Sequence, residues 1–316
     1  MQDKSVFQKF NGELPLDAQR VVANHLPTRD VLEYSLISKD KFTIFGPSLN
    51  SKIRKFLHLG SRGKYDFVET MLKNDMELIC AKGTVTDSAG RTFQDISLFE
   101  YCLWALDMPM WTLLLDCIPQ NETGKTIVEQ CLAQYKNLKA NGVEYCLEGK
   151  YITELHFDFR NTIINELQEY ADLVNQPTVD WNKAEEKWKQ GVGGAQKRFP
   201  MHVVDEYCSD RPFDPVPDFT QQPTPSTKQF YNWDTGAGKN EHWFVLDSKL
   251  GIDFAIVKGA GPIGARAALI GGGRGSPLVD LVAMTALCEA RTKACINLES
   301  QLEKLLTIDN HPKPKT

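Results

Sequence analysis

The sequence lacks three features that would place it in a class directly: a surplus of positive charge, a long apolar run and paired cysteine motifs. Its 316 residues contain 36 Lys and Arg against 41 Asp and Glu, which gives a formal net charge of −5. Non-specific binding of a nucleic-acid backbone requires a basic surface, so we expect no nucleic-acid partner. The apolar runs fall far short of the roughly 20 residues that a membrane-spanning helix needs, so we expect no membrane span. Residues 1–5 also lack the basic-then-apolar pattern of a secretory leader.

The cysteines are few and scattered, and no two of them form a CxxC pair. This spacing predicts neither a disulfide framework nor a structural zinc site. Most of the cysteines lie in apolar, helical-looking stretches, where a free thiol behaves as a small core residue, as is typical of a reducing compartment. They are Cys80, Cys102, Cys117, Cys131, Cys146, Cys208, Cys288 and Cys295.

The first informative segment covers residues 12–45. Its apolar residues recur at helical spacing, and Pro15 and Pro27 suit the first turns of short helices or the connections between them. Helices this short cannot bury so many leucines among themselves. We therefore expect either the rest of the chain or a partner protein to cover them.

This segment resembles an F-box. The shared features are Leu14–Pro15, Val21–Val22, Leu26–Pro27 followed by Asp30, Val31–Leu32, Ser35–Leu36 and Lys41–Phe42. The segment departs from the usual pattern at Ala18–Gln19 and at Ser38–Asp40. The resemblance implies that the segment docks on the Skp-type adaptor of a cullin-RING (SCF) ubiquitin ligase, by placing apolar helix faces in a groove. The residues expected to contact the adaptor are Leu14, Pro15, Val21, Val22, Leu26, Val31, Leu32 and Leu36. The alternative is an ordinary helical cap on the body of the protein.

Residues 52–120 read as helices with an inserted β-hairpin. The adjacent apolar helices around 97–106 and 110–118 resemble an ankyrin-type helix pair. Phe67 and Met110, however, lie further apart than the roughly 33 residues of an ankyrin repeat. The excess contains residues 83–93, which read as a hairpin turning at residues 88–90. A generic helical bundle with a hairpin is the alternative.

The rest of the chain, residues 121–306, reads as an α+β region followed by a disordered tail at 307–316. A second hairpin is expected over 143–153, two short strands at 243–246 and 252–257, and a long helix from Pro277 to Leu306. We therefore predict a mainly α fold with inserted β-hairpins. Its parts are an F-box-like segment at 1–51, degenerate ankyrin-like helix pairs at 52–120, and a C-terminal region with a small antiparallel sheet and a long terminal helix.

Candidate catalytic groups are weak throughout the sequence. Residues 259–264 match the GxGxxG dinucleotide pattern, but neither a long helix nor a strand ending in an acidic residue follows them at the required distance. Cys208 and His202 are too far apart on one short helix to form a nucleophilic dyad, and His156 is more typical of a structural hydrogen bond. We expect no catalytic residue, no cofactor and no metal.

The wider pattern of segments resembles F-box/ankyrin effectors of intracellular bacterial pathogens. This resemblance implies secretion through a type IV system into the host cytoplasm, where the protein would bring an unidentified host target protein to the host SCF ligase without being an enzyme itself. The alternatives are an effector enzyme that modifies a host protein through its C-terminal region, and a non-catalytic ankyrin-like scaffold. An adaptor predicts an exposed apolar N-terminal surface, a cap predicts the same residues buried, and an enzyme predicts a deep pocket with converging polar groups.

Overall fold

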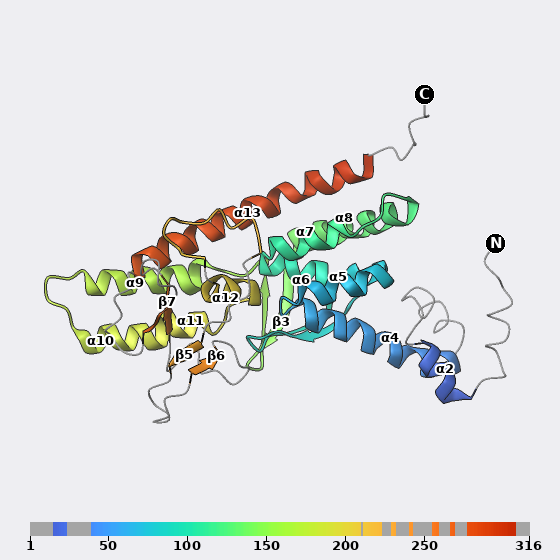
Figure 1. The fold of residues 1–316 in the computed structure, drawn as a ribbon, viewed down its shortest axis with the longest axis horizontal. Coiled ribbons are helices and arrows are strands. Elements are labelled where there is room, and N and C mark those ends of the chain that lie inside the picture. The colour runs from blue at the N-terminus through green and yellow to red at the C-terminus, as the bar shows by residue number, and fades with distance from the viewer. Residues whose placement is uncertain are drawn as a thin grey trace.

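The protein is mainly helical and carries one four-stranded antiparallel sheet and a long C-terminal helix (Figure 1). The computed structural model describes residues 15–23, 39–209, 211–222, 229–231, 240–242, 255–258, 266–268 and 277–307. The predicted α+β fold class is confirmed. Among these residues, no helix combines the length and the apolar character needed to cross a membrane.

The helices include three single-turn or π-helical pieces, labelled η. They are α2 (Leu16–Ala23), α4 (Lys39–Gly60), α5 (Tyr65–Asn74), η1 (Met76–Ile79), α6 (Leu98–Ala105), α7 (Met108–Asp116), α8 (Glu122–Asn141), η2 (Arg160–Ile164), α9 (Asn165–Val174), α10 (Trp181–Glu186), η3 (Lys187–Gly193), α11 (Gly194–Gln196), α12 (Met201–Cys208) and α13 (Pro277–Thr307).

The strands in the described residues form three separate sheets. They are β1 (Gly83–Thr86), β2 (Thr92–Ile96), β3 (Val143–Leu147), β4 (Lys150–Glu154), β5 (Gln229–Tyr231), β6 (Asn240–His242), β7 (Ala255–Val257) and β8 (Arg266–Ala268). The pairs β5–β6 and β7–β8 are each two-stranded. The predicted strand at 243–246 and the glycine-rich stretch at 259–264 lie outside the described residues.

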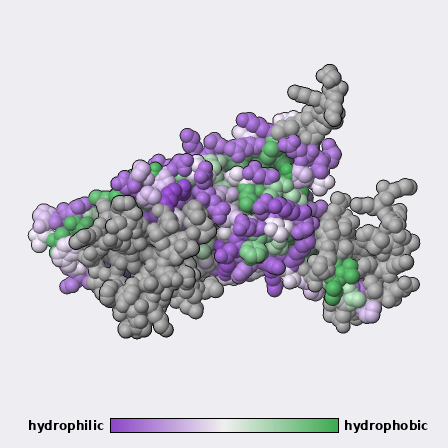
Figure 2. Space-filling model, viewed as in Figure 1, coloured by the Kyte–Doolittle hydropathy of each residue, from purple (hydrophilic) through white to green (hydrophobic). Residues whose placement is uncertain are grey.

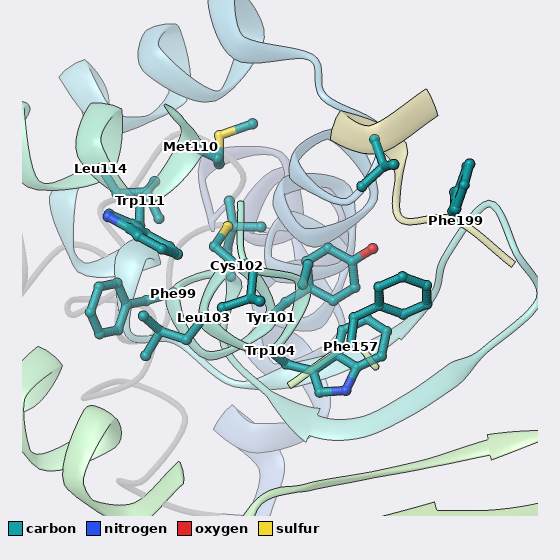
Figure 3. Close-up of a cluster of buried hydrophobic side chains, with 14 of the residues drawn as sticks. Phe99, Tyr101, Cys102, Leu103, Trp104, Met110, Trp111, Leu114, Phe157 and Phe199 are labelled. Atoms are coloured by element: carbon teal, nitrogen blue, oxygen red, sulfur yellow. The ribbon is translucent and has the colours of Figure 1, made fainter. Parts of the chain in front are cut away.

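Helix α6 is the centre of the hydrophobic core. It starts at a reciprocal cap, in which the Ser97 hydroxyl accepts from the Glu100 amide and the Glu100 carboxylate accepts from the Ser97 amide, each at 3.0 Å. It ends at Leu106, whose φ of 56° stops the helix. Every residue of α6 is buried, and apart from Glu100 the helix is apolar around its whole circumference. Figure 3 shows its side chains packing between those of α7 and the aromatic ring of Phe157.

The two hairpins predicted at 83–93 and 143–153 are confirmed as β1–β2 and β3–β4. The sequence analysis did not predict that they join. Strands β2 and β3 pair antiparallel, with Thr92 opposite Cys146 and Phe93 opposite Tyr145, which gives one sheet in the order β1-β2-β3-β4. The sheet therefore contains strands from both sides of the domain boundary proposed at residue 120.

The turn between β1 and β2 carries a buried ion pair. The Asp87 carboxylate accepts hydrogen bonds from the Ala89 and Arg91 amides, both at 2.9 Å, and lies 3.2 Å from Nη1 of Arg91. Arg91 Nη2 donates to the carbonyl of Arg198 at 2.6 Å. A guanidinium that reaches from a hairpin turn to a residue 107 positions later fixes the sheet to the C-terminal region.

The Arg91 guanidinium is also enclosed by aromatic rings. Its central carbon lies 5.2 Å from the ring centres of both Trp104 and Phe157, and 5.6 Å from that of Tyr145. Cation–π contacts of this kind gain strength when the cation is removed from water. Trp104 and Tyr145 also pack on Phe93 of β2, so that the charge and the aromatic cluster hold α6 and the sheet together.

The long C-terminal helix predicted from Pro277 to Leu306 is confirmed as α13. It packs along α8 and α9 (Figure 1). The Tyr135 hydroxyl of α8 donates to the Cys295 carbonyl at 3.1 Å, and Lys139 pairs with Glu299 at 3.0 Å. The predicted tail lies beyond the described residues from position 308 onward.

We predict that Arg91→Met lowers the free energy of unfolding by about 3 kcal/mol, because it leaves the buried Asp87 carboxylate without its counter-charge. Urea denaturation followed by circular dichroism measures the change. Arg54→Met, at an exposed position of α4, is the matched control and should change stability by less than about 0.5 kcal/mol. Equal effects of the two substitutions would contradict a structural role for Arg91.

Candidate functional site

Two places in the structure are candidate sites: the α2 segment and a buried cluster of charges between α7, α12 and α13. Helix α2 contains the first of the residues expected to contact an adaptor. Pro15 is exposed, Val21 is 59% exposed and Val22 is half-buried. The other expected contact residues lie outside the described part of the chain: Leu14, Leu26, Val31, Leu32 and Leu36.

Helix α2 lies at one end of the molecule and packs on α4 (Figure 1). None of the described side chains before Leu49 belongs to the hydrophobic core, whose first member is Ile53. Figure 2 shows apolar surface where α2 lies. The described part of this segment therefore contributes nothing to the core of the body and presents Val21 to solvent.

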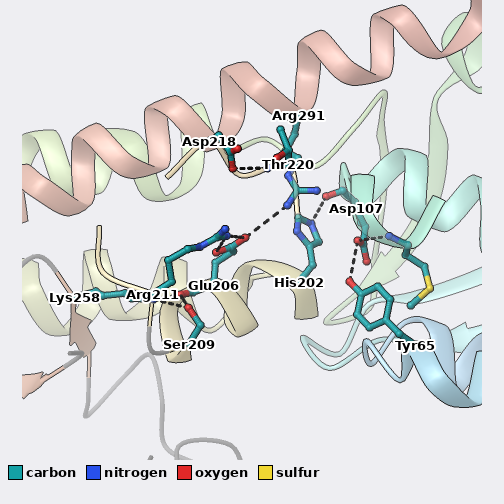
Figure 4. A network of polar contacts seen from close by, with 12 residues as sticks. Tyr65, Asp107, His202, Glu206, Ser209, Arg211, Asp218, Thr220, Lys258 and Arg291 are labelled. Carbon is teal, nitrogen blue, oxygen red and sulfur yellow. Dashed lines mark hydrogen bonds and ion pairs between the residues drawn. The ribbon is translucent and has the colours of Figure 1, made fainter. Parts of the chain in front are cut away.

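The buried charge cluster begins at the start of α7 (Figure 4). The Asp107 carboxylate caps this helix by accepting from the Met110 amide at 3.1 Å, and it also accepts from the Tyr65 hydroxyl at 3.3 Å. Asp107 is only 4% exposed. One short side chain thus connects α5 to α7.

Glu206 of α12 is the centre of the cluster. Its side chain is fully buried, and Nη2 of Arg211 donates to its two carboxylate oxygens at 2.7 and 2.6 Å. Nη2 of Arg291, on α13, lies 3.6 Å from the same carboxylate. Arg291 is completely buried, and none of its guanidinium nitrogens has a hydrogen-bond partner among the described residues. Burial lowers the pKa of Arg291, while the charges of Asp107 and Glu206 oppose that shift.

Lys258 joins the strand β7 to the cluster. Its ammonium donates to the Ser209 hydroxyl at 2.8 Å and to the Glu206 carbonyl. Its amide donates to both carboxylate oxygens of Asp280, in the first turn of α13, at 3.1 and 3.0 Å. These bonds connect β7, α12 and α13, which lie far apart in the sequence. A buried charge that loses its partner is strongly destabilising, so these charged groups depend on one another.

The described residues do not test the Cys208–His202 dyad considered from the sequence, but they show how His202 is held. Nε2 of His202 donates to the Ala105 carbonyl at 2.7 Å. Burial lowers the pKa of His202, so the ring is neutral and its proton lies on Nε2. The side chain of Cys208 lies outside the described residues. His156 likewise bonds locally, with Nδ1 3.0 Å from the Phe157 carbonyl.

Asp205 of α12 has a raised pKa. Burial and the negative charge of Asp107 together raise this pKa from 3.8 to about 7, and Lys64 opposes the shift. Gly63 lies beside this carboxyl: its φ is +64°, and an added Cβ would meet Asp205 Oδ2 at 3.0 Å. The glycine thus makes the turn after α4 and leaves room for the acid.

Sequence reasoning missed this cluster. Glu206 directly follows Asp205, and Arg291 lies between Glu289 and Lys293, so neither residue stands out in the sequence as a buried charge. The partners come from segments far apart in the chain, so the sequence did not show which charges would meet.

The fold and the cluster define an α+β protein in which helices and one antiparallel sheet enclose a network of paired charges. A family model described as "CBUA0006 C-terminal domain" matches residues 162–302, which include Glu206, Arg211 and Arg291. The chain is 37% identical, over 278 residues, to "Uncharacterized protein CBUA0006" of Coxiella burnetii (strain RSA 493 / Nine Mile phase I). The match covers 81% of this chain and 77% of that protein. The chain therefore belongs to the CBUA0006 family. No solved structure matches it.

We predict that the contribution of Asp205 to stability falls as pH rises from about 4 to 7, because the folded-state pKa of Asp205 lies above its ordinary value of 3.8 and the folded protein binds this proton more tightly. Asp205→Asn removes this titrating carboxyl and with it the pH dependence of stability that it causes. At pH 8 the variant should be about 2–4 kcal/mol more stable than the wild type, and the difference should shrink by at least half at pH 5.

Urea denaturation at a series of pH values measures this difference. Asp172→Asn, at an exposed position of α9, is the control and should give a difference that does not change with pH. A constant difference for Asp205→Asn as well would show that its carboxyl is not protonated in the folded protein at neutral pH.

Proposed function

We propose that the chain is an F-box-type substrate adaptor that recruits a host target protein to a host SCF ubiquitin ligase. The proposal extends to a secreted effector acting in the host cytoplasm, because the adaptor it would engage is a host protein and the family relative comes from a bacterium. The chain itself would then catalyse nothing. Holding a target close to the ubiquitin-loading enzyme raises its effective concentration, and that is sufficient for an adaptor.

One observation carries the proposal: the apolar residue Val21 on α2 is 59% exposed, although it matches a contact position of the F-box pattern. A helical cap would bury this residue against the body. An enzyme acting through the C-terminal charges has less support, because Glu206 and His202 already bond to groups of the protein itself. The exposed apolar side chain favours a surface that a partner covers.

Helix α4 connects the proposed contact surface on α2 to the body of the protein. Its 22 residues extend for about 33 Å at about 1.5 Å per residue, from the α2 contact to the core. Ile53, Phe56 and Leu57 at its C-terminal end are buried in the body. A partner bound at α2 would thus be connected to the rest of the protein by one helix, which contains Pro47 in its interior.

We predict sub-micromolar binding of the purified full chain to the human Skp-type adaptor, measured by isothermal titration calorimetry. Val21→Glu and the pair Leu14→Ala, Pro15→Ala should each weaken binding at least tenfold, because burial of an aliphatic side chain contributes roughly 1.5–3 kcal/mol. Phe67→Glu is the matched control, since Phe67 is 61% exposed on α5, outside the proposed contact.

Circular dichroism must show that each variant is folded. Binding that is lost in the α2 variants and kept in Phe67→Glu supports the adaptor function. No binding by the wild type, or an equal loss in the control variant, rejects it.

A further inference from the structure

A basic groove lies between the C-terminal half of α4 and the edge strand β1. Its volume is about 460 Å³, and it is lined by Arg54, Lys55, His58 and Arg62 on one side and by Thr84, Val85 and Thr86 on the other. Arg54, Lys55, His58, Thr84 and Thr86 are exposed. Four basic side chains thus face a strand edge in a protein whose net charge is negative.

Within the described residues, the cations of this groove have no carboxylate partner. Arg54, Lys55 and Arg62 form no ion pair with any residue that the structure describes, whereas Lys52, on the same helix, pairs with Asp75. From Lys41 to Tyr65 the sequence contains no acidic residue. Partial burial and the charge of Arg62 together lower the pKa of His58, as expected where positive charge is not compensated.

The strand side of the groove is a sheet edge. β1 is the terminal strand of the order β1-β2-β3-β4, so one side of its backbone faces away from the sheet. The Thr86 carbonyl accepts a hydrogen bond from Nη1 of Arg62 at 3.2 Å, which shows that this carbonyl points into the groove. Val85, between the two exposed threonines, is buried against the core.

We propose that this groove binds an extended acidic segment of a partner protein, which adds as a strand along β1 and sets its carboxylates against Arg54, Lys55 and Arg62. Main-chain hydrogen bonds to Thr84 and Thr86 would provide the strand pairing. Side chains alternate between the two faces of a strand, so acidic residues at every second position would all face the basic side.

Arg62 links the two parts of this binding mode, the strand pairing along β1 and the contacts between carboxylates and basic side chains. In the free protein its guanidinium occupies the Thr86 carbonyl, an exposed hydrogen bond of small net value. An incoming strand would replace that bond with a main-chain amide. The released guanidinium would then be available for a carboxylate, which it binds in a planar, two-pronged geometry.

The size of the groove favours a peptide over a nucleic acid. β1 has 4 residues, so a paired segment would span roughly 13 Å at about 3.3 Å per residue. Three uncompensated cations suit a few carboxylates, whereas a nucleic-acid backbone requires a broader basic surface. Identifying the segment as part of the recruited target rests on the proposed adaptor function, but binding of the peptide does not.

The test uses the full chain without any adaptor protein and follows fluorescence anisotropy of a labelled ten-residue peptide with Glu at every second position, separated by Val and Thr. The wild type should bind it, and the double variant Arg54→Glu, Lys55→Glu should bind at least tenfold more weakly. Lys125→Glu, Lys150→Glu makes the same change of net charge at exposed positions outside the groove and should stay within twofold of the wild type.

Two further probes test the binding mode. The same peptide with Gln in place of Glu should lose at least tenfold in affinity, and so should a peptide N-methylated at alternate residues, which cannot pair as a strand. The proposal is overturned if the wild type does not bind the peptide or if both double variants lose affinity equally. It is also overturned if the methylated peptide binds as well as the parent peptide, or if a single-stranded oligonucleotide of equal charge binds more tightly than the peptide. If the chain binds this peptide but does not bind the Skp-type adaptor, the proposed peptide groove stands and the proposed adaptor function is rejected.

Discussion

The enclosure of Arg91 is the contact on which the arrangement of the sheet depends. Its guanidinium pairs with Asp87 in the β1–β2 turn, lies against Trp104 of α6, and donates to the carbonyl of Arg198. A buried cation requires compensation on every side, so the turn, the central helix and the C-terminal region must meet around it. The four-stranded sheet forms in this setting because β2 and β3 bring Phe93 and Tyr145 to the same aromatic cluster.

The second set of buried charges has the same effect on the other side of the core. Asp107, Glu206 and Arg291 hold α7, α12 and α13 together, and Lys258 adds β7. Glu206 and Lys258 accept or donate hydrogen bonds within the protein, whereas Arg291 forms no hydrogen bond within the described residues and is compensated by the nearby Glu206 carboxylate, 3.6 Å away. The two surfaces that we propose for partners, α2 and the groove between α4 and β1, contain none of these groups.

Much of the local structure could be predicted from the sequence. Ser97 and Glu100 mark the start of α6, the Glu148–Gly149 turn marks the second hairpin, and Pro277 marks the start of the last helix. The candidate sites were harder to predict from the sequence. Val21 was predicted as a contact residue from a resemblance, whereas the cluster around Glu206 and the groove beside β1 were not predicted, because their residues become neighbours only after α4, α12 and α13 have packed.

The sequence by itself determined which segments become helices or hairpins, because caps, turns and apolar spacing act over a few residues. The tertiary structure alone decided that the two hairpins join in one sheet, that Arg91 meets Arg198, and that Arg291 faces Glu206. It also decided that Arg54, Lys55 and Arg62 lie beside the edge strand β1 without an acidic partner in the described part of the chain. Pairing of strands and charges over such separations depends on which surfaces the whole core buries, and no short sequence pattern contains that information.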